Sequence, residues 1–164
     1  MRIRAGGPPD GDAIFDLLDS AVTWLAARGR TDQWGTEPFA RDPGEGIGRL
    51  IQEASVWIAE HDEHPIGALL LTSGPRPPLT PAPEPEVFVA LLVTDHSVPG
   101  TGAALLDHAR AEARRAGIAL VRVDCYAGGD GALVDYYVRN GFTPVRRFQV
   151  GDWPGMLLEQ RLTP

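Results

Sequence analysis

The chain has 164 residues, the length of one ordinary domain, and 43% of them are hydrophobic, which supplies a substantial core. It carries 15 basic and 22 acidic residues, and the net charge of −7 disfavours nucleic acid and anionic membranes as partners. No segment approaches the roughly 20 apolar residues of a membrane-spanning helix. We therefore expect a single domain over residues 1–164, with no nucleic-acid or membrane partner.

Every basic residue is an arginine, and the chain has no lysine. This excludes lysine Schiff bases and phosphate-binding loops that end in Gly-Lys-Ser/Thr. The single cysteine, Cys125, cannot form an internal disulfide, so we expect a cytoplasmic protein. Cys125 lies in an apolar segment, which favours a buried structural thiol over a covalent nucleophile.

Two helices are predicted in the first third of the chain. Residues 1–5 form a short strand, and Asp10 or Asp12 can then cap a helix that ends near Gly29. Its apolar residues recur at helical spacing: Ile14, Leu17, Leu18, Ala21, Trp24 and Leu25. A second, short helix is expected at about 43–53.

The segment 30–43 between these helices is polar and irregular, yet it contains Trp34 and Phe39. Large aromatic side chains are unusual in a simple connector. They can line a binding pocket, or they can anchor a lid without touching a ligand.

The next part of the chain predicts a hairpin of strands 55–60 and 65–73. Its turn contains His61, Asp62 and His64, which we interpret as solvated turn residues. No set of Cys and His residues has the spacing of a zinc site, so no metal is expected.

Residues 74–86 contain six prolines and cannot pair into a sheet. We predict an extended surface loop. Docking of a partner that recognises proline-rich segments is the alternative.

The second half alternates strands and helices. An apolar run at 87–93 predicts a central strand buried on both faces, and the elements that follow are a helix at 102–116, a strand at 118–126, a helix at 130–140 and strands at 142–150 and 155–162. In the helix at 102–116 the charged residues Arg110, Glu112, Arg114 and Arg115 should point outward. The fold class is α/β with α+β character, a mixed central sheet with helices on both faces.

A glycine-containing turn, between Val93 and Ala103, joins the central strand to its helix. Backbone amides in such a turn, aided by the helix dipole, can hold an anion such as a pyrophosphate without any lysine. The dinucleotide-binding fingerprint does not fit, because Leu105 stands where its third glycine is required. A tight turn that binds nothing has the same glycines, so this pattern is weak evidence alone.

The order of these motifs resembles the GNAT superfamily of acyl-CoA-dependent N-acetyltransferases. Gly100-Thr101-Gly102 opens a helix, a strand follows, and a short helix ends in Tyr137-x-x-x-Gly141-Phe142. The resemblance implies a single GNAT-like domain in which acetyl-CoA lies between splayed strands, those at 87–93 and 118–126. It covers most of the chain and is strongest between Val87 and Phe142.

The resemblance also implies which residues bind acetyl-CoA. In the family a turn of the form Arg/Gln-x-x-Gly-x-Gly/Ala binds the pyrophosphate, and here Ser97 takes the Arg/Gln position. Asp130 stands where the second family motif has Asn, and Pro99 has no amide to donate. The cofactor-binding residues implied are Leu92, Val93, Val98, Gly100, Thr101, Gly102, Ala103 and Asp130.

By the same resemblance, Tyr137 is the general acid that protonates the departing thiolate, although packing of its helix is an alternative role. Glu86 is a candidate general base, together with Asp95 and His96, and none of the three is fixed by the family pattern. The acceptor pocket would involve the neighbouring residues Gln33 and Trp34.

We therefore expect an enzyme that acetylates a small amine or a peptide N-terminus, and a homodimer is compatible with such folds by analogy. Two alternatives remain open. One is a non-catalytic acyl-CoA-binding sensor or partner module on the same fold, and the other is a nucleotide-binding regulator that uses the glycine turn.

Overall fold

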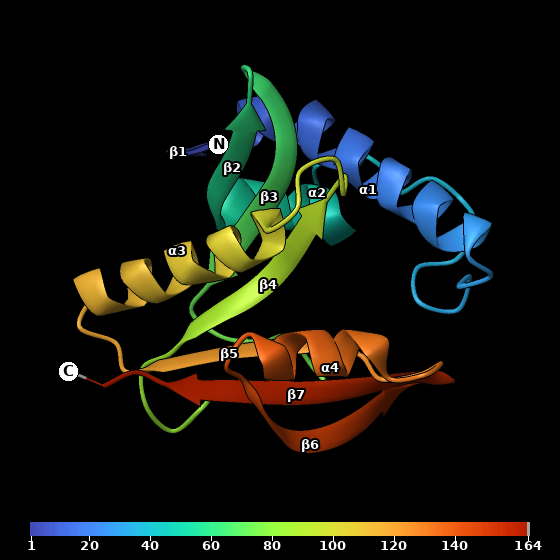
Figure 1. Cartoon of the computed structure of the whole chain (residues 1–164). Helices are drawn as coiled ribbons and strands as arrows, with labels where there is room; N and C mark the ends of the chain where they lie inside the picture. The colour runs from blue at the N-terminus through green and yellow to red at the C-terminus, as the bar shows by residue number, and fades with distance from the viewer. Residues whose placement is uncertain (164) are drawn as a thin grey trace. The chain divides into compact units, whose positions relative to one another are not determined.

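The computed structural model describes residues 1–163 and contains a mixed sheet with helices (Figure 1). Its elements are β1 (Arg2–Ala5), the 3-10 helix η1 (Pro8–Asp10), α1 (Gly11–Ala27), α2 (Gly46–Glu53), β2 (Ser55–His61), β3 (His64–Thr72), β4 (Val87–Thr94), α3 (Thr101–Arg115), β5 (Leu120–Tyr126), α4 (Ala132–Arg139), β6 (Thr143–Val150) and β7 (Trp153–Arg161). The hydrogen-bonded strand order is β1-β2-β3-β4-β5-β7-β6, with β4 and β5 parallel. The predicted mixed α/β fold is confirmed.

The described chain divides into two compact units. The first contains residues 1–71 and 91–105, and the second contains residues 72–90 and those from 106 onward. Both β4 and α3 run from one unit into the other. A single domain over the whole chain stays a prediction.

The helices end close to where their capping residues predict. After α3, Gly117 adopts a φ of 71° and the amide of Ile118 donates to the carbonyl of Ala113 (2.8 Å), which is a glycine-based helix cap. Ile118 therefore belongs to the cap, and the strand predicted from residue 118 begins at Leu120. Among the described residues no helix is both long and apolar enough to cross a bilayer.

In the first unit, β1, β2 and β3 are antiparallel neighbours, and β2 and β3 form the predicted hairpin. Asp62 and Glu63 have φ angles of 50° and 66° in its tight turn. Of the predicted apolar face of α1, Trp24 is half-buried and the other residues are buried, namely Ile14, Leu17, Leu18, Ala21 and Leu25. Phe15 and Val22, which were not predicted, are buried as well.

Asp10 precedes α1, but its carboxylate does not cap this helix as predicted. It accepts hydrogen bonds from Nη2 of Arg4 (2.8 Å) and from the amide of Gly7 (3.0 Å). A charge-assisted bond to a guanidinium is stronger than a bond to a neutral amide, which explains this preference. The hydrogen bond from Arg4 also lowers the pKa of Asp10.

In the second unit, β5, β7 and β6 form an antiparallel sheet, and β4 joins β5 in parallel through Val87–Val89 and Val121–Val123 (Figure 1). The proline-rich segment 74–86 packs on this sheet. Leu79 from the segment forms a buried cluster with Phe88 of β4 and Leu157 of β7. The segment is thus anchored at Leu79, while none of its prolines is buried.

Glu86, one of the predicted candidate bases, is part of a buried ion pair. Its side chain is buried, and its carboxylate forms two hydrogen bonds with Arg122, from Nε (2.7 Å) and from Nη2 (2.8 Å). It also accepts the amide of Ala82 (2.6 Å), while Nη2 of Arg122 donates to the carbonyl of Thr80 (2.9 Å). Both oxygens of Glu86 are occupied in this way, which makes it a poorer proton acceptor than a group with a free lone pair.

Replacing Arg122 with methionine should lower the free energy of unfolding by about 3–5 kcal/mol, because the Glu86 carboxylate would remain buried without its counter-charge. Urea unfolding followed by circular dichroism measures this loss. The matched control is Arg161→Met, which breaks the exposed ion pair between Arg161 and Glu84. It should leave the urea concentration at the midpoint of unfolding nearly unchanged. Equal losses in the two variants would contradict the role given to the buried pair.

Candidate active site

The turn after β4 is fixed by hydrogen bonds within the first unit. The amide of Asp95 donates to the carbonyl of Ile66 (3.0 Å), which extends the contact between the turn and β3. The carboxylate of Asp95 then accepts both the amide (2.9 Å) and the hydroxyl (2.6 Å) of Ser97. Gly100 adopts a φ of 84°, where a side chain would be strained. The turn therefore has one defined path into α3.

The first turn of α3 presents backbone donors. The first helical hydrogen bond runs from the amide of Ala104 to the carbonyl of Gly100 (3.0 Å), so the amides of Thr101, Gly102 and Ala103 precede it. The hydroxyl of Thr101 donates to the carbonyl of Val98 (2.8 Å), which holds the start of the helix to the turn. Three amides at a helix N-terminus, with the helix dipole behind them, favour an anion.

A glycine in β3 sets the position of this helix start. A Cβ on Gly67 would lie 2.9 Å from Cγ2 of Thr101, 3.1 Å from Cδ1 of Leu105 and 3.2 Å from the carbonyl oxygen of Val93. Only a residue without a side chain leaves room for this approach. The donor set and its close support fit a diphosphate, because main-chain amides can replace the lysine that this chain lacks.

The side chain of Trp24, from α1, contacts the turn. The ring of Trp24 stacks on that of His96, with centroids 4.1 Å apart and an interplanar angle of 13°. The guanidinium of Arg28 lies 3.8 Å from the centre of the Trp24 ring. Partial burial and the nearby charge of Arg28 lower the pKa of His96, so its imidazole is neutral at pH 7.

The loop that follows α1 is held by charges on the exposed face of that helix. Arg41 forms ion pairs with Asp12 (3.3 Å), Asp16 (3.0 Å) and Asp19 (3.0 Å). Asp19 also accepts the amide of Phe39 (3.2 Å). The three aspartates are spaced four and three residues apart, so they lie on one side of α1 and together hold this loop.

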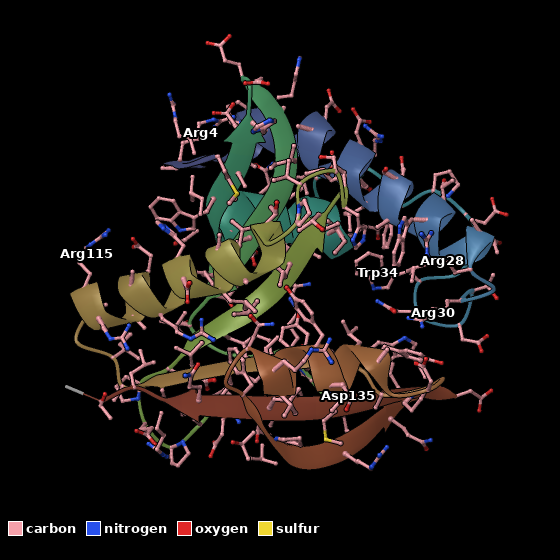
Figure 2. The ribbon with its side chains drawn as sticks, in the orientation of Figure 1. Arg4, Arg28, Arg30, Trp34, Arg115 and Asp135 are labelled. Carbon is pink, nitrogen blue, oxygen red and sulfur yellow. The ribbon has the colours of Figure 1, made fainter. Side chains whose placement is uncertain are left out.

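Gln33 and Trp34, the two predicted acceptor-binding residues, are both half-buried in this loop. The ring of Trp34 meets that of Phe39 edge to face, with centroids 5.9 Å apart. Figure 2 shows Arg28, Arg30 and Trp34 at the same end of the first unit, where α1 gives way to the loop.

In the second unit, Tyr137 lies near the end of α4 and is buried. The amide of Phe142 donates to the carbonyl of Tyr137 (3.0 Å), and the amide of Gly141 donates to the carbonyl of Val138 (3.0 Å). With a φ of 96° at Gly141, these two bonds make a Schellman cap. The predicted motif Tyr-x-x-x-Gly-Phe is thus the sequence of a helix end. The rings of Tyr137 and Phe142 meet edge to face, with their centroids 5.9 Å apart.

The hydroxyl of Tyr137 is protonated at any physiological pH. Burial raises its pKa, and the neighbouring Cys125, Tyr136 and Asp124 raise it further. A hydroxyl in this state can donate a proton but cannot serve as a base near neutrality.

The family model described as "Acetyltransferase (GNAT) family" matches residues 17–142, a range that includes both the turn and the α4 cap. The chain belongs to this family. As a GNAT protein it is an acyltransferase.

Solved structures share the GNAT fold with this chain. A GNAT family acetyltransferase from Listeria monocytogenes has a TM-score of 0.73 and 21% identity, and the match covers 98% of this chain and 94% of that one. A protein from Salmonella typhimurium, solved with its cofactor acetyl-CoA, has a TM-score of 0.67 and 18% identity over 100% and 95% of the two chains. PaiA N-acetyltransferase from Thermoplasma acidophilum, in complex with coenzyme A, has a TM-score of 0.66 and 16% identity over 98% of each chain. Comparison with curated proteins found no significant match.

Asp130, a predicted cofactor-binding residue, and the single cysteine Cys125 both lie in the second unit. Asp130 is exposed and accepts the amide of Ala132 (3.0 Å), so it bends the chain into α4. Burial raises the pKa of Cys125 to about 12, which agrees with a structural thiol. Within residues 1–163 no group of three or more His, Cys, Asp or Glu side chains could hold a metal ion.

Sequence reasoning missed several residues that shape the candidate site. Gly67 carried a signal, since a glycine inside an apolar strand often marks a close approach of another segment. Trp24 was assigned to the apolar face of α1, and its stacking on His96 had no signal, because the two residues are far apart in the sequence. The contact between Arg41 and α1 was hidden for the same reason.

Replacing Gly67 with alanine should weaken the binding of coenzyme A by about tenfold, because displacing α3 loses about one charge-assisted amide bond. Isothermal titration calorimetry with coenzyme A measures this. Thr101→Ser removes the closest methyl group but keeps the hydroxyl that bonds to Val98, so adding it to Gly67→Ala should recover part of the affinity. The control is Gly11→Ala, since a Cβ at Gly11 meets no atom within 4 Å. Unchanged affinity in Gly67→Ala would refute this support for the turn.

Proposed function

We propose that this GNAT protein transfers the acetyl group of acetyl-CoA to a primary amine of a small molecule or of a peptide N-terminus. The observation that carries the proposal is the set of three amides at the start of α3, of Thr101, Gly102 and Ala103. Structures of similar fold have been solved with acetyl-CoA and with coenzyme A, which supports this choice of acyl donor.

Each part of the turn has a proposed binding role. The amides of Val98 and of residues 100–103 hold the pyrophosphate, and Leu92 and Val93 bind the pantetheine part with their main chain. The amide near Val93 polarises the thioester carbonyl, as an oxyanion hole does. When bound, acetyl-CoA supplies an acetyl group that is already activated as a thioester.

Tyr137 is proposed as the general acid. Burial raises the pKa of Tyr137, so its hydroxyl keeps its proton on Oη in the resting enzyme. The hydroxyl then donates this proton to the thiolate sulfur of the departing coenzyme A. The cap that follows α4 ties the backbone of Tyr137 to Phe142, so this hydroxyl is borne by a rigid element.

His96 is proposed as the base in place of Glu86. An amine with a pKa near 10.4 is almost entirely charged at pH 7, so it must lose a proton before it attacks. The imidazole of His96 is neutral at this pH, and its ring is held against Trp24. Asp95 is less suitable, because its carboxylate already accepts two hydrogen bonds from Ser97.

Around the acceptor, Gln33 and Trp34 are proposed to line the amine site, since both lie in the loop that Arg41 holds against α1. A non-catalytic acyl-CoA sensor is the second candidate. It is favoured by Ser97 at the Arg/Gln position, because Ser97 bonds to Asp95 and its amide is thereby engaged. A homodimer and a cytoplasmic location also stay predictions.

A panel of amines tests the proposal. The protein is incubated with acetyl-CoA and with small amines, amino acid derivatives and peptides, and release of free thiol is followed. Sustained release with at least one amine supports the enzyme. Stabilisation by acetyl-CoA in a thermal shift assay, with no thiol release from any amine, would favour the sensor instead, and stabilisation by ATP alone would favour a nucleotide-binding protein.

Replacing Tyr137 with phenylalanine should lower kcat by about 10²-fold, the usual contribution of a general acid, because the ring is kept and only the proton donor is lost. Affinity for acetyl-CoA, measured by calorimetry, should stay within about twofold, as expected for a group that acts only in the reaction. The matched control is Tyr126→Phe in β5. A kcat equal to that of the natural chain would remove Tyr137 from the mechanism.

The pH dependence tests His96. A base must be unprotonated, and the pKa of His96 lies below its usual 6.5, so activity should be present above that pKa and lost as the pH falls through it. His96→Gln should remove this acid limb and lower kcat/KM by about 10²-fold at pH 7. His61→Gln, in the exposed hairpin turn, is the control that should keep both. An acid limb that survives in His96→Gln would assign the base elsewhere.

A further inference from the structure

Arg110 of α3 is buried, although its place among charged residues predicted that it would point outward. Its guanidinium meets three acceptors within the second unit. Nε donates to the side-chain oxygen of Gln160 (2.6 Å), Nη1 donates to the carboxylate of Asp107 (2.8 Å), and Nη2 donates to the carbonyl of Asn140. A buried charge is stable only when its donors are occupied in this way, so the group has a specific position.

One of these acceptors belongs to the end of α4. Asn140 is the capping residue of that helix, and the Schellman cap satisfies the carbonyls of Tyr137 and Val138 from within the chain. The carbonyl of Asn140 is left to Arg110. A positive charge at the C-terminal end of a helix is also favoured by the helix dipole. Arg110 therefore completes the cap from a different helix.

The same guanidinium contacts the aromatic side of the cap. Its central carbon lies 5.4 Å from the centre of the Phe142 ring, and that ring meets Tyr137 edge to face. The side chain of Gln160, which Arg110 holds, lies 3.0 Å from where a Cβ on Gly141 would be. Arg110 thus contacts Asn140 and Phe142, the residues on either side of Gly141 in the cap at the end of α4.

We propose that Arg110 is a positioning residue, which fixes the hydroxyl of Tyr137 through the α4 cap and the Phe142 ring. The inference rests on the proposed function, in which Tyr137 is the general acid. A guanidinium suits this role because its planar donors can serve three acceptors at once. A lysine at the same place has one compact charged group, and a methionine has none.

The first test is a cycle of variants at the two positions. Arg110→Met should lower kcat by about tenfold, with the KM for acetyl-CoA within about twofold, and Arg110→Lys, which keeps the charge and folds more readily, should not restore the rate. In the Tyr137→Phe background, Arg110→Met should cause no further loss of kcat. Arg114→Met, at an exposed position of the same helix, is the control. A full tenfold loss in both backgrounds would overturn the inference.

The second test needs no bound ligand. The chain has three tyrosines, so incorporation of 3-fluorotyrosine gives three ¹⁹F NMR signals, and the one absent in Tyr137→Phe belongs to Tyr137. That signal should shift or broaden in Arg110→Lys, while the signal of Tyr126 stays unchanged. An unmoved Tyr137 signal in this folded variant overturns the inference. Full kcat in Tyr137→Phe overturns instead the acid role, and with it the catalytic part of this inference, even where the Tyr137 signal moves.

Discussion

The contact between β3 and the start of α3 fixes the turn that offers the main-chain donors of the first unit. Gly67 allows Thr101 to approach β3 more closely than any side chain would permit. Because Thr101 also bonds to Val98, the contact fixes both the helix and the turn before it. The open amides then stand on a rigid support, and rigid donors lose little entropy when an anion binds. The absence of a side chain at Gly67 in β3 thereby determines the geometry of the turn.

The second unit depends on two buried arginines. Arg122 joins the proline-rich segment to β5, and Arg110 joins α3 to the end of α4. Each donates to a specific acceptor: Arg122 to the carboxylate of Glu86, and Arg110 to the backbone carbonyl of Asn140. Arginine suits such places better than lysine, because several planar donors can be satisfied in one position. These arginines therefore hold two backbone segments in place, the proline-rich segment 74–86 and the end of α4.

The sequence alone predicted the fold well, because its signals are local. Apolar periodicity identified the helices and strands, and the helix expected at 130–140 lies within two residues of α4 at both ends. Charged residues were harder to assign, since burial depends on partners that are distant in the chain. Glu86 and Arg122 are 36 residues apart, and Arg110 and Gln160 are 50 apart, so neither pair leaves a local pattern. The same limit applies to the stacking of Trp24 on His96.

The loop at 30–43 and the turn between β4 and α3 are held in place by different kinds of contact. Arg41 and its aspartate partners are exposed ion pairs, whereas Gly67 and Thr101 meet in the interior. Exposed side chains tolerate substitution far better than packed ones. The exposed ion pairs that hold the loop can therefore be replaced with less damage to the fold than the packed contact between Gly67 and Thr101.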